Sequence, residues 1–226
     1  MIILAIETSG ASASAAVLGE GVSGVADSPL PRAHAQVLPG LIETAAARAG
    51  VAREAVTHVA AARGPGLFTG MRVGLVTADM IGLALDLPVV GVSSLAAAAR
   101  RVQQRHQPTE QFAVLLDARR REVFAQVFDP AGKPVSEPGT LALDEVGAAA
   151  GHGMPAGAGT IWVDPAAAAL GFPGHPLEVS GLAAEVAAVA WQRWQEGAGH
   201  EPPTPMYLRR PDTSRANPQR SVLGQR

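Results

Sequence analysis

The chain has 226 residues, of which 47% are hydrophobic and 17% charged, so it can bury a core as one large domain or two small ones. It contains no cysteine, which excludes disulfides, thiolate nucleophiles, cysteine-ligated zinc and iron–sulfur clusters. The formal net charge of −2 argues against a dedicated nucleic-acid binder, although the residues from Glu201 onward are basic and the rest of the chain is acidic.

The first half of the chain alternates strand and helix patterns. Strands are expected over residues 2–6, 14–18, 22–27, 56–62 and 89–92. Helices are expected over residues 37–49, 71–87 and 95–105, the last with Arg100, Arg101 and Arg105 on its exposed face. The opening strand has no basic lead, unlike a signal peptide, and Asp79, Asp86 and Pro88 interrupt the longest apolar stretch. We therefore expect a cytoplasmic protein that does not span a membrane.

The second half repeats the strand pattern more weakly. A strand pair is expected at 112–116 and 122–128, a short helix at 144–150 and a final helix at 182–194, while 151–176 has few periodic cues. This order predicts an α/β protein with the actin-like ATPase (ASKHA) fold, made of two ribonuclease-H-like lobes of which the second is degenerate. We assign the lobes to 1–107 and 108–200, followed by a Pro-rich and then basic tail, 201–226, in which order fades after Pro211.

A glycine-rich segment, Gly64-Pro65-Gly66-Leu67-Phe68-Thr69-Gly70-Met71-Arg72-Val73-Gly74, joins a strand to a helix. Its glycines indicate a sharp turn that a ligand or partner can approach closely, with Thr69 as the expected N-cap of the helix. The alternative is a tight connection that binds nothing. No lysine ends the loop, so it is not a phosphate-binding loop of the Walker type.

A polar turn, Glu7-Thr8-Ser9, ends the first strand, and Asp117 occupies the matching place in the second lobe. A carboxylate at such a strand end could hold hydrated Mg²⁺, whereas the plainer interpretation is that both carboxylates cap turns. Weak candidates for phosphate contacts are Glu7, Thr8, Ser9, Gly64, Gly66 and Gly70. We expect no cofactor, with weak nucleotide binding left open.

The helix at 71–87 is apolar on two opposite sides, so both sides need a cover. One cover is the sheet of its own lobe, and the other is either the helix at 37–49 or another protein. Small residues at i, i+4 and i+8 would let a second helix approach closely. The expected partner surface consists of Val37, Leu38, Leu41, Ile42, Val73, Gly74, Ala78, Met80 and Gly82.

Catalytic and metal-binding patterns are missing from the sequence. The six histidines are too far apart in sequence for any two to share a helix face, and no Gly-x-Ser-x-Gly elbow or Cys–His pair occurs. A lone His34 before the helix at 37–49 predicts a capping or buried hydrogen-bonding group. The sequence thus nominates no catalytic residue and no metal ligand.

Six segments in this order resemble the bacterial TsaB (YeaZ) family, over nearly the whole chain. They are Ile6-Glu7-Thr8-Ser9, Arg32-x-His34-x-x-x-Leu38-Pro39, Gly64 to Gly74, Gly91-Val92-Ser93, Asp117-Ala118-Arg119-x-x-Glu122-Val123 and Pro205-x-Tyr207-Leu208-Arg209.

The resemblance implies a part in making threonylcarbamoyladenosine, the modified adenosine 3′ of the anticodon in tRNAs that read codons starting with A. It implies a non-catalytic partner of a larger TsaD-type paralogue, joined by a TsaE-type P-loop ATPase, with tRNA reached indirectly through the complex. A homodimer is expected when the chain is alone.

The paralogue's metal-binding His-x-x-x-His pair falls, by this resemblance, at Ser94 and Ala98, which cannot bind iron or zinc as histidine does. The chain is therefore expected to hold no transition metal. Two other classes remain as alternatives, a small sugar-kinase-like ATPase or phosphotransferase and a glycoprotease-like peptidase. An adenosine-binding subdomain, which the first alternative needs, is not evident in the second half.

Overall fold

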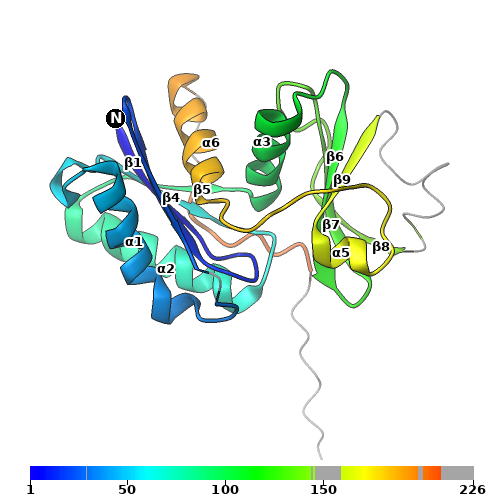
Figure 1. The fold of residues 1–226 in the computed structure, drawn as a ribbon, viewed down its shortest axis with the longest axis horizontal. Coiled ribbons are helices and arrows are strands. Elements are labelled where there is room, and N and C mark those ends of the chain that lie inside the picture. Colours follow the sequence, from blue (N-terminus) through cyan, green and yellow to red (C-terminus); the bar gives the residue numbers. More distant parts are fainter. Residues whose placement is uncertain (29, 144, 146–158, 198–200, 210–226) are drawn as a thin grey trace, which may run out of the picture.

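The computed structural model describes residues 1–28, 30–143, 145, 159–197 and 201–209, and it contains two five-stranded sheets (Figure 1). The first sheet has the order β3-β2-β1-β4-β5 and consists of β1 (Ile2–Glu7), β2 (Ser14–Gly19), β3 (Val22–Asp27), β4 (His58–Ala62) and β5 (Val89–Val92). The second has the order β10-β9-β6-β7-β8 and consists of β6 (Phe112–Arg119), β7 (Glu122–Phe128), β8 (Gly139–Ala142), β9 (Thr160–Val163) and β10 (His175–Pro176).

The two sheets have the same topology. β1 is antiparallel to β2 and parallel to β4, and β6 is likewise antiparallel to β7 and parallel to β9. Each sheet is extended by one more antiparallel strand on one side and one more parallel strand on the other. This duplication confirms the expected actin-like ATPase fold. The second sheet is reduced in strand length, since β10 has two residues, but it lacks none of the five strands.

Helices cover both faces of the first sheet (Figure 1). They are α1 (His34–Ala49), α2 (Phe68–Leu85), α3 (Ser94–His106), α5 (Pro165–Ala169) and α6 (Ala183–Gln195), with a short 3₁₀ turn, η1 (Arg53–Ala55). α1 and α2 lie on the outer face of the first sheet, whereas α3 and α6 lie between the sheets. The helix expected at 144–150 falls, apart from residue 145, outside the described residues.

Alternation along the strands explains these layers. Ile3 and Ala5 point into the core between the sheets, whereas Leu4 and Ile6 point to the clusters under α1 and α2. Both faces of the sheet are therefore buried, which is why its strands read as continuous apolar runs rather than alternating ones.

Arg101 is not on an exposed face, so that expectation is wrong. It is 5% exposed and forms a buried ion pair with Glu185 of α6, with Nε 2.8 Å from Oε1. It also donates hydrogen bonds to the carbonyl oxygens of Glu178, Ser180 and Gly181. A buried guanidinium needs such a complete set of acceptors, and here it joins α3 to α6 and to the loop before α6.

α2 begins earlier than expected, at Phe68, so Thr69 lies in its first turn and is not its N-cap. The cap position belongs to Leu67, whose side chain makes no capping hydrogen bond. By length and apolar composition alone α2 could cross a membrane. Its buried side, however, packs on the first sheet and β5 follows it, as expected for a helix of a folded domain.

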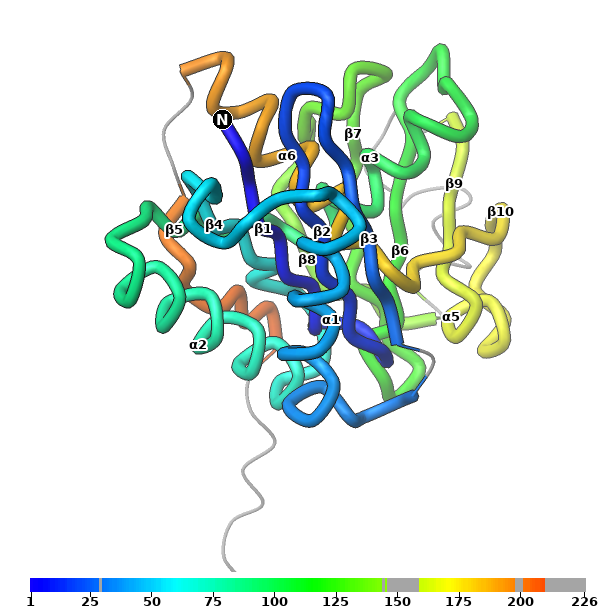
Figure 2. The backbone as a smooth tube through the Cα atoms, turned by 60° about the vertical axis from the view of Figure 1, so that its left-hand side comes forward, coloured from blue at the N-terminus to red at the C-terminus, as the bar shows by residue number. Residues whose placement is uncertain are grey.

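Residues 201–209 return to the first sheet, where they run past β5 and behind α2 (Figure 2). The Gly91 amide donates to the Glu201 carbonyl at 2.8 Å, and the Met206 amide donates to the Arg63 carbonyl at 2.7 Å. The Pro-rich start of the tail is thus bonded to the first lobe, whereas the expected loss of order after Pro211 lies outside the described residues.

Candidate functional site

Two strand ends face one cleft between the lobes. Glu7 and Asp117 are each the sixth residue of their strands, β1 and β6, so the duplication places them at equivalent positions. Both line a cavity of about 260 Å³ together with Ser9, Ser94 and Asp164. The structure therefore brings together the two carboxylates that the sequence suggested as pseudo-symmetric partners.

Glu7 caps the turn that follows β1. Its Oε1 accepts hydrogen bonds from the Ser9 amide at 2.6 Å, the Ser9 hydroxyl at 2.5 Å and the Gly10 amide at 3.2 Å. Burial raises the pKa of Glu7, because loss of water disfavours the carboxylate more than these hydrogen bonds and nearby His34 favour it. The geometry is that of the turn-capping alternative.

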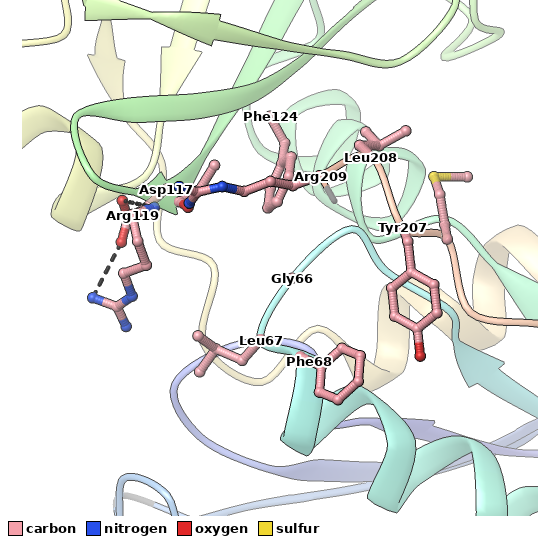
Figure 3. Close-up of a pocket in the computed structure, with 11 residues that line it drawn as sticks. Gly66, Leu67, Phe68, Asp117, Arg119, Phe124, Tyr207, Leu208 and Arg209 are labelled. Carbon is pink, nitrogen blue, oxygen red and sulfur yellow. Dashed lines mark hydrogen bonds and ion pairs between the residues drawn. The ribbon is translucent and has the colours of Figure 1, made fainter. Parts of the chain in front are cut away.

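Asp117 also caps a turn, through the hydrogen bond from the Arg119 amide to its Oδ1 at 2.9 Å. Its other oxygen pairs with the Arg119 guanidinium at 3.2 Å (Figure 3). Asp164, which follows β9, accepts from the Asp117 amide and from the Ala167 amide, and so caps α5. Burial raises the pKa of Asp164 as well.

The glycines of the 64–74 segment are explained by contacts within the chain. A Cβ at Gly66 would collide with the Ser9 carbonyl, and a Cβ at Gly70 would collide with the Thr8 carbonyl. The Thr8 hydroxyl donates to the Gly70 carbonyl at 2.8 Å. The start of α2 is thus pressed against the turn after β1. Of the three glycines suggested as phosphate contacts, Gly64 and Gly70 are buried, and only Gly66 lines the cleft.

Other expected positions have structural roles. His34 is buried, with Nε2 3.0 Å from the Gly10 carbonyl oxygen, as a hydrogen-bonding histidine should be. Ser94 Oγ lies 2.7 Å from Ser9 Oγ, and Ala98 is fully buried in the core between the sheets. Among the residues that the structure describes, no group of three His, Asp or Glu side chains could hold a metal ion.

One side of α2 carries an exposed apolar stripe that consists of Val76, Met80 and Leu83. These side chains are 60%, 61% and 81% exposed. Apolar residues of a helix normally face the core of the protein. The exposed stripe is the second apolar side of α2 that the sequence predicted. Met80 is the one residue of the stripe that the sequence placed in a partner surface.

The small residues of α2 face the other way, which corrects their expected place on the surface. Gly74 packs against Thr8, Ala78 is fully buried, and Gly82 packs against Val89. These positions allow α2 to lie close to its own sheet and do not receive a second helix. Leu38 of α1 is likewise buried, whereas Val37, Leu41, Ile42 and Val73 are partly buried.

A second cavity was missed by the sequence reasoning. It has a volume of about 400 Å³ and is lined by Gly66, Leu67, Phe68, Asp117, Ala118, Arg119, Phe124, Met206, Tyr207, Leu208 and Arg209. We call it the aromatic–arginine pocket (Figure 3). Phe68 and Tyr207 are stacked with their centroids 5.3 Å apart, and the Arg72 guanidinium lies 4.0 Å from the Phe68 centroid. Three of the six segments that carry the family resemblance supply all of the lining except Phe124, but nothing in the sequence predicts that they meet.

Comparison with known proteins agrees with this architecture. A family model described as TsaD, tRNA N6-adenosine threonylcarbamoyltransferase, matches residues 13–198. The structure of YeaZ from Pseudomonas aeruginosa superimposes with a TM-score of 0.77 at 29% identity, covering 92% of this chain and 99% of that one. An uncharacterised protein of Mycobacterium tuberculosis is 32% identical over 87% of this chain and 82% of its own length.

Two curated relatives carry a functional name. Proteins of Haemophilus influenzae and Escherichia coli, both named tRNA threonylcarbamoyladenosine biosynthesis protein TsaB, are 35% and 32% identical over 56% and 55% of this chain. The matched part spans about half of their length, 54% and 53%. The chain therefore belongs to the TsaD family, and within that family to the TsaB (YeaZ) proteins that its sequence resembles.

Proposed function

We propose that this protein acts in tRNA threonylcarbamoyladenosine biosynthesis as a non-catalytic subunit that docks a TsaD-type transferase. The named relatives support the pathway. The observation that carries the docking role is the apolar stripe on α2, since an exposed Leu83 beside Met80 and Val76 costs solubility unless a partner covers it. In this proposal the complex includes a TsaE-type P-loop ATPase, acts in the cytoplasm, and contacts tRNA mainly through the transferase.

We propose a non-catalytic role because the candidate metal-binding and phosphate-binding positions make structural contacts within the chain. Ser94 is hydrogen-bonded to Ser9, Ala98 is packed in the core between the sheets, and Glu7 accepts hydrogen bonds from the turn that it caps. The space beside Gly64 and Gly70 is occupied by other residues of the chain. We accordingly propose no resident cofactor and at most weak nucleotide binding in the cleft. Within the described ranges, no feature favours the kinase or peptidase alternatives.

The partner surface in this proposal is narrower than the sequence suggested. It consists of the stripe on α2 with the partly exposed side chains of α1 next to it, Leu41 and Ile42. A paralogue of the same fold would present equivalent helices, which gives a pseudo-symmetric contact of four helices. Without the paralogue, a second copy would cover the same surface, so we propose a homodimer for the isolated chain.

The experiment is a binding titration between the purified chain and the TsaD-type protein, followed by reconstituted modification of tRNA. Met80→Asp and Leu83→Asp should each weaken binding by roughly tenfold or more, because a carboxylate would be buried in an apolar contact. The loss should appear as less threonylcarbamoyladenosine in tRNA at limiting protein. Both positions are exposed in a single chain, so the substitutions should leave its circular-dichroism spectrum unchanged, which separates lost binding from lost folding.

Val135→Asp is the matched control, since Val135 is 47% exposed on the second lobe. It should leave both binding and modification unchanged. Stripe variants that stay folded and bind the transferase as tightly as the unaltered chain would place the contact elsewhere. No binding by the unaltered chain would overturn the proposed function itself.

A further inference from the structure

The hairpin between β6 and β7 uses arginines where the backbone favours glycine. Arg119, Arg120 and Arg121 all have positive φ angles, 65°, 54° and 62°. Arg119 pairs with Glu122, so Arg120 and Arg121 form the two-residue loop. A loop with two positive φ angles normally has Asn-Gly or Gly-Gly, because a Cβ is strained in this region. The geometry of the turn therefore does not explain why arginine occupies these positions.

The same hairpin borders the aromatic–arginine pocket. Arg119 lies on one side of the pocket, and Phe68 and Tyr207 lie beside each other on another (Figure 3). Arg209 reaches the wall from the chain's last described segment, where it donates to the Ala118 carbonyl at 3.0 Å. The start of α2 at Phe68 adds the positive end of a helix dipole.

The charge around this pocket is opposite to that of the molecule. Arg119 and Arg209 line it, Arg72 lies over Phe68, and Arg120 and Arg121 follow Arg119 in the hairpin loop, against the carboxylates of Asp117 and Glu122. The whole chain has a net charge of −2. The positive charge is thus concentrated beside the two aromatic rings.

Both rings are partly exposed to solvent. Phe68 and Tyr207 are each 43% exposed, although aromatic side chains of this size are usually covered. Arg72 holds them in place, with its guanidinium over Phe68 and its Nε donating to the Tyr207 hydroxyl at 2.9 Å. Such a fixed aromatic platform accepts the face of a planar ring without a further ordering cost.

We propose that the aromatic–arginine pocket and the Arg119–Arg121 hairpin bind a single-stranded segment of RNA directly. One unstacked base lies against the Phe68–Tyr207 pair, and the flanking phosphates lie against the arginines. A row of cations beside exposed rings is the combination by which proteins hold single strands. A duplex keeps its bases stacked and cannot use the rings. That the RNA is the tRNA substrate rests on the proposed function, whereas the binding site itself does not.

The first test removes charge without harming the fold. Arg121→Gly should raise the melting temperature, because glycine suits the second loop position, and should weaken binding of an unstructured RNA of about 12 nucleotides. The slope of log affinity against log salt should fall by about one unit for the lost phosphate contact. Fluorescence anisotropy over a salt series measures both. Arg53→Ala, a substitution of an exposed arginine in the 3₁₀ turn η1, should alter neither affinity nor slope.

The second test removes the stacking surface. Tyr207→Ala should weaken binding of the same RNA by about tenfold. It should leave the slope of log affinity against log salt unchanged, since no phosphate contact is lost. Tyr207→Phe retains the ring and should bind nearly as the unaltered chain does. A duplex of equal length should bind more weakly and should not respond to Tyr207→Ala.

The outcomes separate this inference from the proposed function. If Arg121→Gly and Tyr207→Ala bind RNA as the unaltered chain does, the RNA site is wrong, even where the chain docks the transferase and supports modification. If RNA binding responds as expected but the transferase does not bind, the RNA site stands and the proposed function fails. In the reconstituted complex, both variants should raise the tRNA concentration needed for half-maximal rate and leave transferase binding intact.

Discussion

The two lobes share one sheet topology but differ in the helices and the side-chain contacts that follow their strands. The first sheet has a full helix, α2, between its parallel strands β4 and β5, whereas the second has the five-residue α5 between β9 and β10. Equivalent strand ends differ as well, because Glu7 is buried among three donors and Asp117 pairs with the Arg119 side chain. A repeated sheet fixes where a side chain lies, and the local packing decides what that side chain does.

This difference suggests a division of labour. The longer α2 presents the apolar stripe that we propose as a partner surface, and the second lobe contributes the arginine hairpin to the pocket between the lobes. α3 and α6, which follow equivalent strands in the two lobes, pack on each other and hold the sheets together. Four substitutions test how far the two lobes are equivalent.

The largest effect is expected where the two equivalent helices are joined. Arg101→Ala would leave Glu185 buried without its partner and should lower the free energy of unfolding by about 3–5 kcal/mol. Chemical denaturation measures this. Arg53→Ala breaks the exposed pair with Glu54 and should leave stability unchanged. Equal effects of the two substitutions would mean that Arg101 does not hold the lobes together.

A smaller loss is expected at the start of α2, which relies on close approach in place of a cap. Gly70→Ala gains helix propensity but brings its Cβ against the Thr8 carbonyl, so a net loss of roughly 1–3 kcal/mol is expected. Gly40→Ala in α1 has no atom within 4 Å of the added Cβ and should gain up to about 1 kcal/mol. Thermal or chemical unfolding of the pair should therefore give opposite signs.

The start of α5 uses a capping side chain. Asp164→Ala should cost about 1–2 kcal/mol, because the amides of Ala167 and Asp117 both lose their acceptor. Asp164→Asn retains a side-chain oxygen and should cost less. Should Asp164→Ala be neutral in unfolding experiments, the contrast between a capped α5 and an uncapped α2 has no energetic meaning.

The smallest effect concerns the strand ends. The pKa of Glu7 is raised by burial, so between its ordinary and raised values the folded state holds the proton more tightly than the unfolded chain does. The free energy of unfolding must then fall as pH rises through that window. Glu7→Gln removes this dependence, and its stability relative to the unaltered chain should increase with pH above the ordinary range of glutamate. A pH series of denaturant melts that shows a constant difference would contradict the raised pKa.

Much of the fold was predictable because local signals were strong. The strands of the first lobe, the β6–β7 pair and the helices ending at Ala49 and His106 follow apolar periodicity and turn residues, which act over a few neighbours. The short strands β9 and β10 were not predicted, since four and two residues carry too little pattern and are specified by pairing with distant β6 and with each other.

The candidate sites divide in the same way. The sequence indicated that α2 is apolar on two sides. It also offered turn capping for Glu7 and Asp117 and a buried hydrogen bond for His34, and the structure shows both. It placed Gly74, Ala78 and Gly82 on the wrong side, because a stripe of small residues fits a sheet beneath as well as a helix above. The choice depends on which side meets the sheet, and that follows from how β4 and β5 flank the helix.

By itself the sequence determined the order of strands and helices in the first lobe, the absence of cysteine chemistry and the family resemblance, since each depends on residues close together in the chain or on composition. Only the tertiary structure decided that Arg101 is buried against Glu185, that Met80 and Leu83 are exposed, and that Phe68, Arg119 and Tyr207 border one pocket. These features depend on segments that are tens of residues apart in the chain. Their geometry is set by how the two sheets and the helices pack.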